Sequence, residues 1–201
     1  MKTKSLCVVS GGIDSVTALY SEVLESKHEV TVMTFLHPGR HTKELECVRW
    51  HAEKLGCEVV EHRLDKLWSA DIGKLRQKPC RNLVFAALAA NYACAYRIPR
   101  VVMGVHARDV DYLDCQRKYV GEYTDLVYEL TDRRVVLVTP FLTWGKKEIV
   151  ELGLQLGVDY THTWSCYERG EHHCGQCVSC KERVQGFGQL GIQPSDPRVL
   201  P

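Results

Sequence analysis

Two serines and two glycines stand just before the first helical pattern of the chain, in an arrangement suited to binding phosphate. Residues 10–15 read Ser-Gly-Gly-Ile-Asp-Ser and follow an apolar run at residues 6–9. Glycines let the backbone approach an anion closely, and the first turn of a helix offers unpaired N–H groups and the positive end of its dipole. Asp14 fits beside phosphate as a Mg²⁺ ligand or as a helix cap. An ordinary strand-to-helix turn, with an aspartate or a serine as N-cap, is the alternative that these residues leave open.

Four cysteines crowd the last forty residues at a spacing typical of a metal site. They are Cys166, Cys174, Cys177 and Cys180. Four thiolates at this spacing close a tetrahedral site, and Gly175 permits the tight turn that directs two sulfurs at one ion. We expect Zn²⁺, with an iron–sulfur cluster or free, redox-active thiols as alternatives. His172 and His173 are expected to lie in solvent, because the cysteines already fill the coordination shell.

Composition and charge are those of an ordinary globular protein. The chain has 201 residues, of which 45% are hydrophobic and 25% charged, and its net charge is +1. This length predicts one domain with an appendage, and the charge balance argues against a large face for nucleic acid. The sequence has neither an apolar stretch of membrane-spanning length nor a signal-peptide pattern. The other six cysteines are dispersed in apolar segments, so we expect a reducing, cytoplasmic location.

Predicted strands and helices, which must position the phosphate loop and the cysteines, alternate along the chain. Apolar, Val-rich runs predict strands at residues 6–9, 30–35, 57–62, 101–104 and 135–138, buried on both faces. Helical spacing predicts helices at residues 16–25, 45–55, 83–96 and 149–156, with Gly56 and Gly157 as C-terminal stops. The alternation predicts an α/β fold with a doubly wound, Rossmann-like parallel sheet, in which ligands gather at the carboxyl ends of the strands. Residues 10–15 lie at such an end.

With these signals in place, the chain resembles the 7-cyano-7-deazaguanine synthase family, within the ATP pyrophosphatases whose phosphate loop reads Ser-Gly-Gly-x-Asp-Ser. The similarity covers nearly the whole chain. Besides the loop and the cysteines, the matching pieces are Arg40-His41, residues 79–85, Gly104 to Ala107 with Asp109, Asp114-Cys115, residues 139–141, residues 146–153 and residues 163–167. Their order along the chain makes the resemblance more specific than the phosphate loop alone.

The resemblance implies a fold like that of the adenine nucleotide alpha-hydrolases. It implies a nucleotide-binding domain at residues 1–160 and a zinc-binding element at residues 161–201 packed on it. The implied reaction is the ATP-dependent conversion of 7-carboxy-7-deazaguanine and ammonia to 7-cyano-7-deazaguanine, through an adenylated carboxylate and an adenylated amide. ATP, Mg²⁺ and Zn²⁺ are the implied cofactors, and a homodimer is the implied assembly.

The resemblance also implies roles for particular residues. Nucleotide binding is assigned to Val9, Ser10, Gly11, Gly12, Ile13, Asp14, Ser15 and Val16. The catalytic assignments are Asp14, Ser15 and Lys146. Substrate contacts are assigned to Arg40, His41, Arg81, Asn82, Asp109 and Asp114.

Plainer interpretations of the same residues stay open. Lys146 could be a solvated lysine at a helix start, and Asn82 could cap the following helix beside a surface Arg81. Arg40 and His41 could belong to a turn before a surface helix, and Cys115 is expected to be a buried, inert thiol.

Three departures from the family fall near the expected ligand mouth and leave the substrate open. They are the short segment at residues 65–78, the loop at residues 37–39, and residues 111–113. A related adenylating enzyme that acts on another carboxylate, on a protein or on tRNA is therefore one alternative. A non-enzymatic zinc module that binds nucleic acid is another, although the near-neutral charge and the intact phosphate loop weigh against it.

Overall fold

One parallel sheet forms the centre of the molecule in a computed structural model, which describes residues 2–65, 80–106, 113–168 and 170–200. The strands are β1 (Lys4–Val8), β2 (Glu29–Leu36), β3 (Glu58–Arg63), β4 (Arg100–Met103) and β5 (Val136–Val138). Their order is β3-β2-β1-β4-β5, and every pairing is parallel. The predicted doubly wound α/β sheet is confirmed, with each strand within two residues of its predicted bounds.

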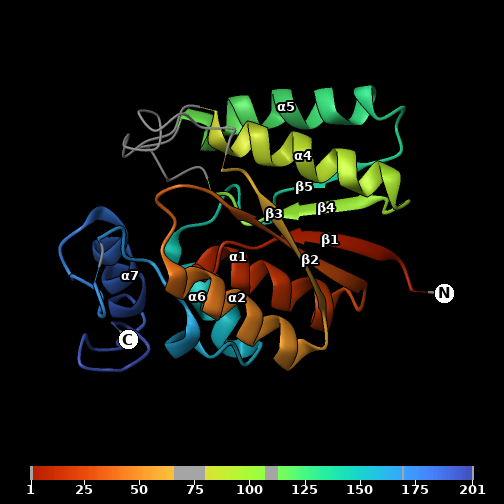
Figure 1. Ribbon diagram of the computed structural model, residues 1–201. Helices are drawn as coiled ribbons and strands as arrows, with labels where there is room; N and C mark the ends of the chain where they lie inside the picture. Colours follow the sequence, from red (N-terminus) through yellow and green to blue (C-terminus); the bar gives the residue numbers. More distant parts are fainter. Residues whose placement is uncertain (1, 66–79, 107–112, 169, 201) are drawn as a thin grey trace.

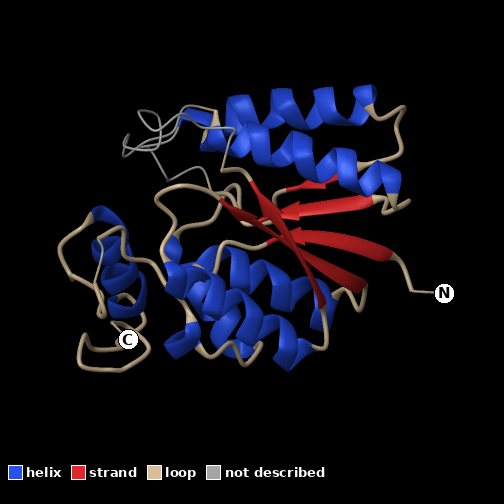
Figure 2. Ribbon diagram, in the orientation of Figure 1, coloured by secondary structure: helices blue, strands red, loops and turns tan. Residues whose placement is uncertain are grey.

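Helices cover both faces of this sheet (Figures 1 and 2). Figure 1 shows α4 (Arg81–Ala95) and α5 (Arg117–Leu130) on one face and α1 (Ile13–Tyr20), α2 (Thr42–Leu55) and α6 (Lys146–Gln155) on the other. Helix α7 (Val178–Gly188) and the C-terminus lie beside the edge at which the strands end. Short 3-10 turns occupy Leu113–Cys115 and Tyr160–His162. Among the described helices, none is both long and apolar enough to span a bilayer.

Successive side chains along each strand point to opposite faces of the sheet, so the hydrophobic core has two parts, one on each face. Leu6 and Met33 pack with the helices α4 and α5, whereas their neighbours Cys7 and Val32 pack with α1, α2 and α6. The face of α4 that lies in the core is made of small side chains: Ala86, Ala89, Ala90 and Ala93. Short side chains let α4 pack close to the sheet. Because alanine is only weakly apolar, the buried face of α4 differs little in hydrophobicity from its other face.

The predicted helix pattern needs three corrections. The helix expected at residues 16–25 begins earlier, at Ile13, and its last turn, Ser21–Glu25, is a π-helix. Helix α5 was not predicted, although Val120, Tyr123 and Val127 form its buried face at helical spacing. Helix α7 was not predicted either, because the cysteines and glycines that interrupt it hide its pattern. The glycine stops were correct, since Gly56 and Gly157 adopt positive φ at the ends of α2 and α6.

The order of the strands places a crevice beside β1. The chain builds the sheet outwards from β1 to β3, then crosses to β4 on the other side of β1. In open parallel sheets, ligands bind at the carboxyl ends of the strands where the order reverses in this way. The predicted phosphate loop follows β1 directly and therefore lies at this switch point.

Candidate nucleotide-binding site and metal centre

The loop after β1 is held by its two serines. The backbone N–H of Ser10 donates to Ser15 Oγ at 3.1 Å, and Ser15 Oγ donates to the carbonyl oxygen of Gly12 at 3.2 Å. Gly12 is the N-cap of α1, and no side chain caps that helix. The plain-turn interpretation with an aspartate or serine cap is therefore wrong. The first N–H groups of α1 remain open towards a ligand.

Gly11 is required where it stands for two independent reasons. Its φ is +95°, and a Cβ at this position would overlap the backbone carbonyl of Glu44 in α2. Gly104, at the end of β4, has a similar constraint, because its Cβ would lie 2.7 Å from the backbone of Asp14. The two glycines let α2 and β4 close on the loop from either side.

If the loop binds phosphate as the sequence predicts, replacing Gly11 by alanine is expected to weaken nucleotide binding by about tenfold and to lower the free energy of unfolding by about 1–3 kcal/mol. The matched control is Gly121→Ala in α5, where an added Cβ meets nothing within 4 Å and should stabilise the helix slightly. Titration with a nucleotide analogue and urea unfolding measure both effects. If the Gly11 variant binds nucleotide as the control does, the close approach of α2 does not shape the loop.

Lys146, which is 132 residues from Asp14 in the sequence, contacts the carboxylate of that aspartate. Lys146 Nζ lies 2.7 Å from both carboxylate oxygens of Asp14, and the two side chains are 15% and 22% exposed. His106 Nε2, on the segment after β4, lies 3.4 Å from Lys146 Nζ and 3.7 Å from Asp14 Oδ2. Lys146 starts α6, but its ammonium points into the site, so the solvated-lysine interpretation is wrong. The group combines a cation and an anion beside the open end of α1.

Arg40 fastens the end of β2 to the loop. Its side chain is 6% exposed, and its guanidinium donates to Thr34 Oγ1, the Phe35 carbonyl and the Ser10 carbonyl at 2.6–2.8 Å. Burial lowers the pKa of Arg40, and the carboxylate of Glu44, 3.3 Å from its Nε, offsets part of that effect. Next to it, His41 caps α2 and accepts from the Lys43 N–H at 3.1 Å. Arg40 is thus a buried clamp and His41 begins a helix, as the plainer interpretation had it, while the substrate contacts predicted for both residues stay predictions.

On the other side of the crevice, Asn82 is anchored to the segment that follows β4. Its N–H donates to Asp114 Oδ2 at 2.6 Å, and its side-chain amide donates to Asp114 Oδ1 at 3.3 Å and to Cys115 Sγ at 3.1 Å. Cys80 is the N-cap of α4, so the interpretation of Asn82 as the cap is wrong; Asp114 binds that helix start from outside. The buried position predicted for Cys115 is confirmed.

A cavity of about 600 Å³ joins these parts. Predicted site residues on its wall are Val9, Ser10, Gly12, Ile13, Asp14, Ser15, Arg40, His41, Arg81, Asn82, Lys146 and Cys166. Gly11, Val16 and Asp114 are not on the wall, and Asp109 lies outside the described residues, as do residues 66–78 and 111–112 of the departing segments. Wall residues that sequence reasoning did not assign include Phe35, His37, Phe85, His106, Trp164 and Arg183. Of these, Phe85, His106 and Trp164 stand within the segments that resemble the family, which was a usable signal.

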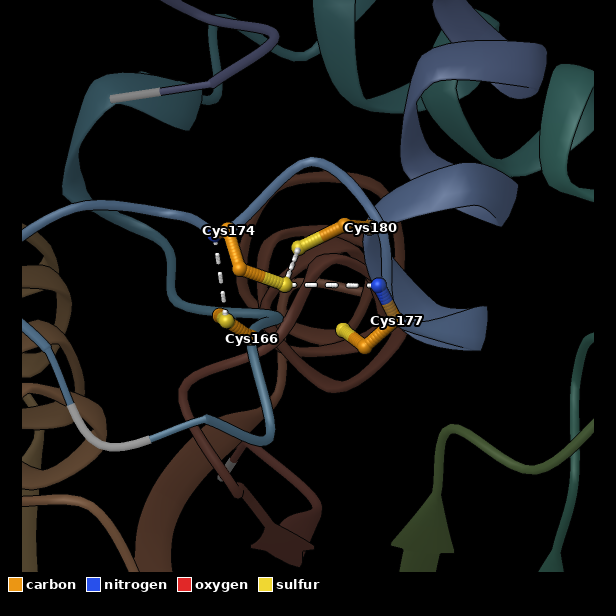
Figure 3. Close-up of side chains that lie close together, drawn as sticks. All are labelled: Cys166, Cys174, Cys177 and Cys180. Carbon is orange, nitrogen blue, oxygen red and sulfur yellow. Dashed lines mark hydrogen bonds between the residues drawn. The ribbon is translucent and has the colours of Figure 1, made fainter.

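The four cysteines come together as predicted (Figure 3). The sulfur atoms of Cys166, Cys174, Cys177 and Cys180 all lie within 4.8 Å of one another. A tetrahedral Zn–S bond of about 2.3 Å requires sulfurs about 3.8 Å apart, so this spacing fits a single ion. Hydrogen bonds from the N–H groups of Gln176 and Cys177 lower the pKa of the Cys174 thiol to about 7. Burial instead raises the pKa of the Cys166 and Cys180 thiols, so the spacing of the four sulfurs is the feature that marks the cluster as a possible metal site.

Aromatic rings fix the loop between the first two cysteines. Trp164 stacks with His41 at a centroid distance of 4.7 Å, and the ring of His173 lies 4.3 Å from it on a tilted plane. His173 is buried and its Nε2 accepts from the Ser165 N–H at 3.0 Å, so the prediction that it lies in solvent is wrong. His172 is exposed, as predicted. Neither histidine is part of the sulfur cluster.

Comparison with known proteins identifies relatives along nearly the whole chain. The family model described as "Queuosine biosynthesis protein QueC" matches residues 4–191. A 7-cyano-7-deazaguanine synthase from Caldicellulosiruptor saccharolyticus is 33% identical, with 94% of this chain and 93% of the relative covered. One from Methanoregula boonei is 31% identical, with 96% and 97% covered.

Solved structures with the same fold are more distant in sequence. The U34-tRNA thiolase NcsA from Methanococcus maripaludis, with its [4Fe-4S] cluster, has a TM-score of 0.54 at 14% identity, covering 98% of this chain and 69% of that one. NMN synthetase from Francisella tularensis has a TM-score of 0.52 at 16% identity, covering 98% and 82%. At such identities the likeness concerns the fold alone.

Proposed function

The chain belongs to the QueC family of queuosine biosynthesis, and from that premise we propose that its cavity converts 7-carboxy-7-deazaguanine and ammonia to 7-cyano-7-deazaguanine at the expense of ATP. Family membership makes the protein an enzyme, a 7-cyano-7-deazaguanine synthase, which excludes the non-enzymatic zinc module. The observation that carries the assignment to this cavity is the meeting of Asp14 and Lys146 beside the open N-terminus of α1.

We assign the nucleotide phosphates to the loop at residues 10–15. The backbone N–H groups at the start of α1 donate to phosphate oxygens, and the ammonium of Lys146 neutralises the charge that develops when the α-phosphate is attacked. Asp14 orients Lys146 through both carboxylate oxygens. A carboxylate is also a fitting ligand for Mg²⁺, which would neutralise phosphate charge when bound.

The acid substrate lies, in this proposal, on the α4 side of the loop. Arg81 and Asn82 line the cavity there, beside the ring of Phe85, and offer a cation, an amide and a planar face. Arg40 and Asp114 support this arrangement indirectly, by holding the phosphate loop and the start of α4. Asp109 remains a proposed acceptor for the ring N–H groups of the deazapurine.

The reaction needs the protein for positioning more than for covalent chemistry. The substrate carboxylate attacks the α-phosphorus and pyrophosphate leaves; ammonia then displaces AMP, and one proton is lost from nitrogen as the amide forms. The amide oxygen is adenylated in the same way, and loss of AMP and of the two remaining protons from nitrogen gives the nitrile. Both adenylation steps develop negative charge on the phosphates of ATP. The same loop contacts can therefore stabilise both transition states.

The remaining assignments extend the proposal. We assign Zn²⁺ to the four cysteines in a structural role, because their thiolates leave no open coordination position. We divide the chain into a nucleotide-binding domain at residues 1–160 and a zinc-binding element at residues 161–201, working as a homodimer in the cytoplasm.

An omission experiment tests the proposed function. AMP formation is measured with 7-carboxy-7-deazaguanine, ATP, Mg²⁺ and an ammonium salt, then with each component left out in turn. We expect AMP only when all four components are present, because ammonia displaces AMP from the adenylated acid. AMP formation driven equally well by another carboxylate, and not by this acid, contradicts the assigned substrate.

A further inference from the structure

One residue touches both the cysteine cluster and the phosphate loop. The indole ring of Trp164 packs in a buried cluster with Cys166, Cys177 and Cys180, and its Nε1–H donates to the carbonyl of Cys166 at 3.0 Å. The backbone N–H of the same residue donates to the carbonyl oxygen of Gly11 at 2.9 Å. A shift of this residue therefore alters the wall of the metal site and the shape of the phosphate loop together.

Arg183 of α7 fixes the segment that carries Trp164. It lies one helical turn beyond Cys180 and is completely buried. On this segment, its guanidinium donates to Thr163 Oγ1 at 2.8 Å, to Ser165 Oγ at 3.1 Å and to the Tyr160 carbonyl at 2.7 Å. Two further bonds of 2.6 Å go to the carbonyl oxygens of Arg198 and Val199. Hydrogen bonds from a charged donor are stronger than neutral ones, so this set holds the segment rigidly against α7.

Helix α7 also supports the lysine of the site. A Cβ on Gly186 would lie 2.5 Å from Lys146 Cγ, so the bare backbone of α7 forms the surface on which the lysine stem rests. The same helix begins at the cluster, with Cys177 as its N-cap and Cys180 in its first turn. Lys146 thus rests on a helix that starts at the cysteines, and Arg183 of the same helix holds the segment whose Trp164 N–H bonds the phosphate loop.

We propose that Trp164 and Arg183 are positioning residues that couple occupancy of the cysteine cluster to nucleotide binding at the phosphate loop. The inference rests on the proposed function, in which metal fills the cluster and ATP binds the loop. A metal ion held by Cys177 and Cys180 fixes the start of α7, and Arg183 then holds Trp164 against Gly11. Without metal, α7 loosens and the loop relaxes, while the buried parallel sheet persists.

Nucleotide affinity in the absence of metal is the direct test. Binding of a non-hydrolysable ATP analogue with Mg²⁺ is measured by calorimetry on the metal-loaded protein and on chelator-treated protein, with retained helicity checked by circular dichroism. We expect affinity to fall about tenfold on metal removal, the size of one good hydrogen bond. Equal affinities overturn the coupling but leave the proposed function intact, whereas no binding by the metal-loaded protein overturns both.

A single substitution tests the hydrogen bond between Arg183 and Thr163 in the metal-loaded protein. Thr163→Val keeps side-chain shape but deletes the hydroxyl that accepts from Arg183 at 2.8 Å. Its matched control is Thr131→Val, another buried threonine, which bonds Tyr128 and Val135 far from the cavity. For Thr163→Val we expect KM for ATP to rise about fivefold with kcat nearly unchanged, and for the control neither to move. If the two variants have the same KM for ATP, the proposal is overturned.

Discussion

Replacing Lys146 by methionine is expected to slow adenylation of the acid by about 10²–10³-fold while the protein stays folded. Lys146 is the only lysine among the described residues on the cavity wall, and its ammonium contacts both oxygens of Asp14. Methionine keeps the unbranched stem that rests on Gly186 but removes the charge. Asp14 is 22% exposed, so water can replace its lost partner and little stability should be lost.

The neighbouring lysine provides the control for this prediction. Lys147 is exposed on the next position of α6, so Lys147→Met removes the same charge outside the cavity and should leave turnover unchanged. Single-turnover formation of AMP, followed with both variants at saturating ATP, measures the effect. Equal rates in the two variants would mean that Lys146 has no role in the charge stabilisation proposed here.

Replacing Cys177 by serine is expected to abolish tight metal binding and to lower the midpoint of thermal unfolding by about 10 °C, or about 4 kcal/mol of folding free energy. Cys177 is buried, contributes one of four clustered sulfurs and is the N-cap of α7. Losing one thiolate leaves three of the four clustered sulfurs, which opens the coordination shell of a closed tetrahedral site. Metal content and a thermal scan of the same sample give both values.

Cys57→Ser is the matched control, because Cys57 is a half-buried thiol outside the cluster whose sulfur contacts the carbonyl of Leu55. It should keep full metal content with only a small fall in the unfolding midpoint. Stoichiometric zinc in Cys177→Ser is the result that would refute the four-cysteine assignment.

The phosphate loop, the strands and the cysteine cluster were predictable because each is written locally in the sequence. Apolar runs marked the strands, although the prediction that all are buried on both faces is wrong for the edge strands β3 and β5, which are partly exposed. The loop and the cluster depend on short, fixed spacings. Helix α5 carried a readable signal at Val120, Tyr123 and Val127 that was not used.

The roles of individual polar residues were less predictable, because their partners come from distant parts of the chain. Arg40 lines the cavity, but its guanidinium also bonds to Thr34, Phe35 and Ser10, a structural role that the sequence did not indicate. His173 looked solvated but is buried against Trp164. In each case tertiary packing, which no local pattern encodes, decided what the side chain does.

The identity of the product tests the central claim most directly. The metal-loaded enzyme is supplied with 7-carboxy-7-deazaguanine, ATP, Mg²⁺ and ¹⁵N-labelled ammonium, and the products are weighed by mass spectrometry. The account predicts 7-cyano-7-deazaguanine carrying one ¹⁵N atom, together with AMP and pyrophosphate. AMP and pyrophosphate without any labelled nitrile would contradict it.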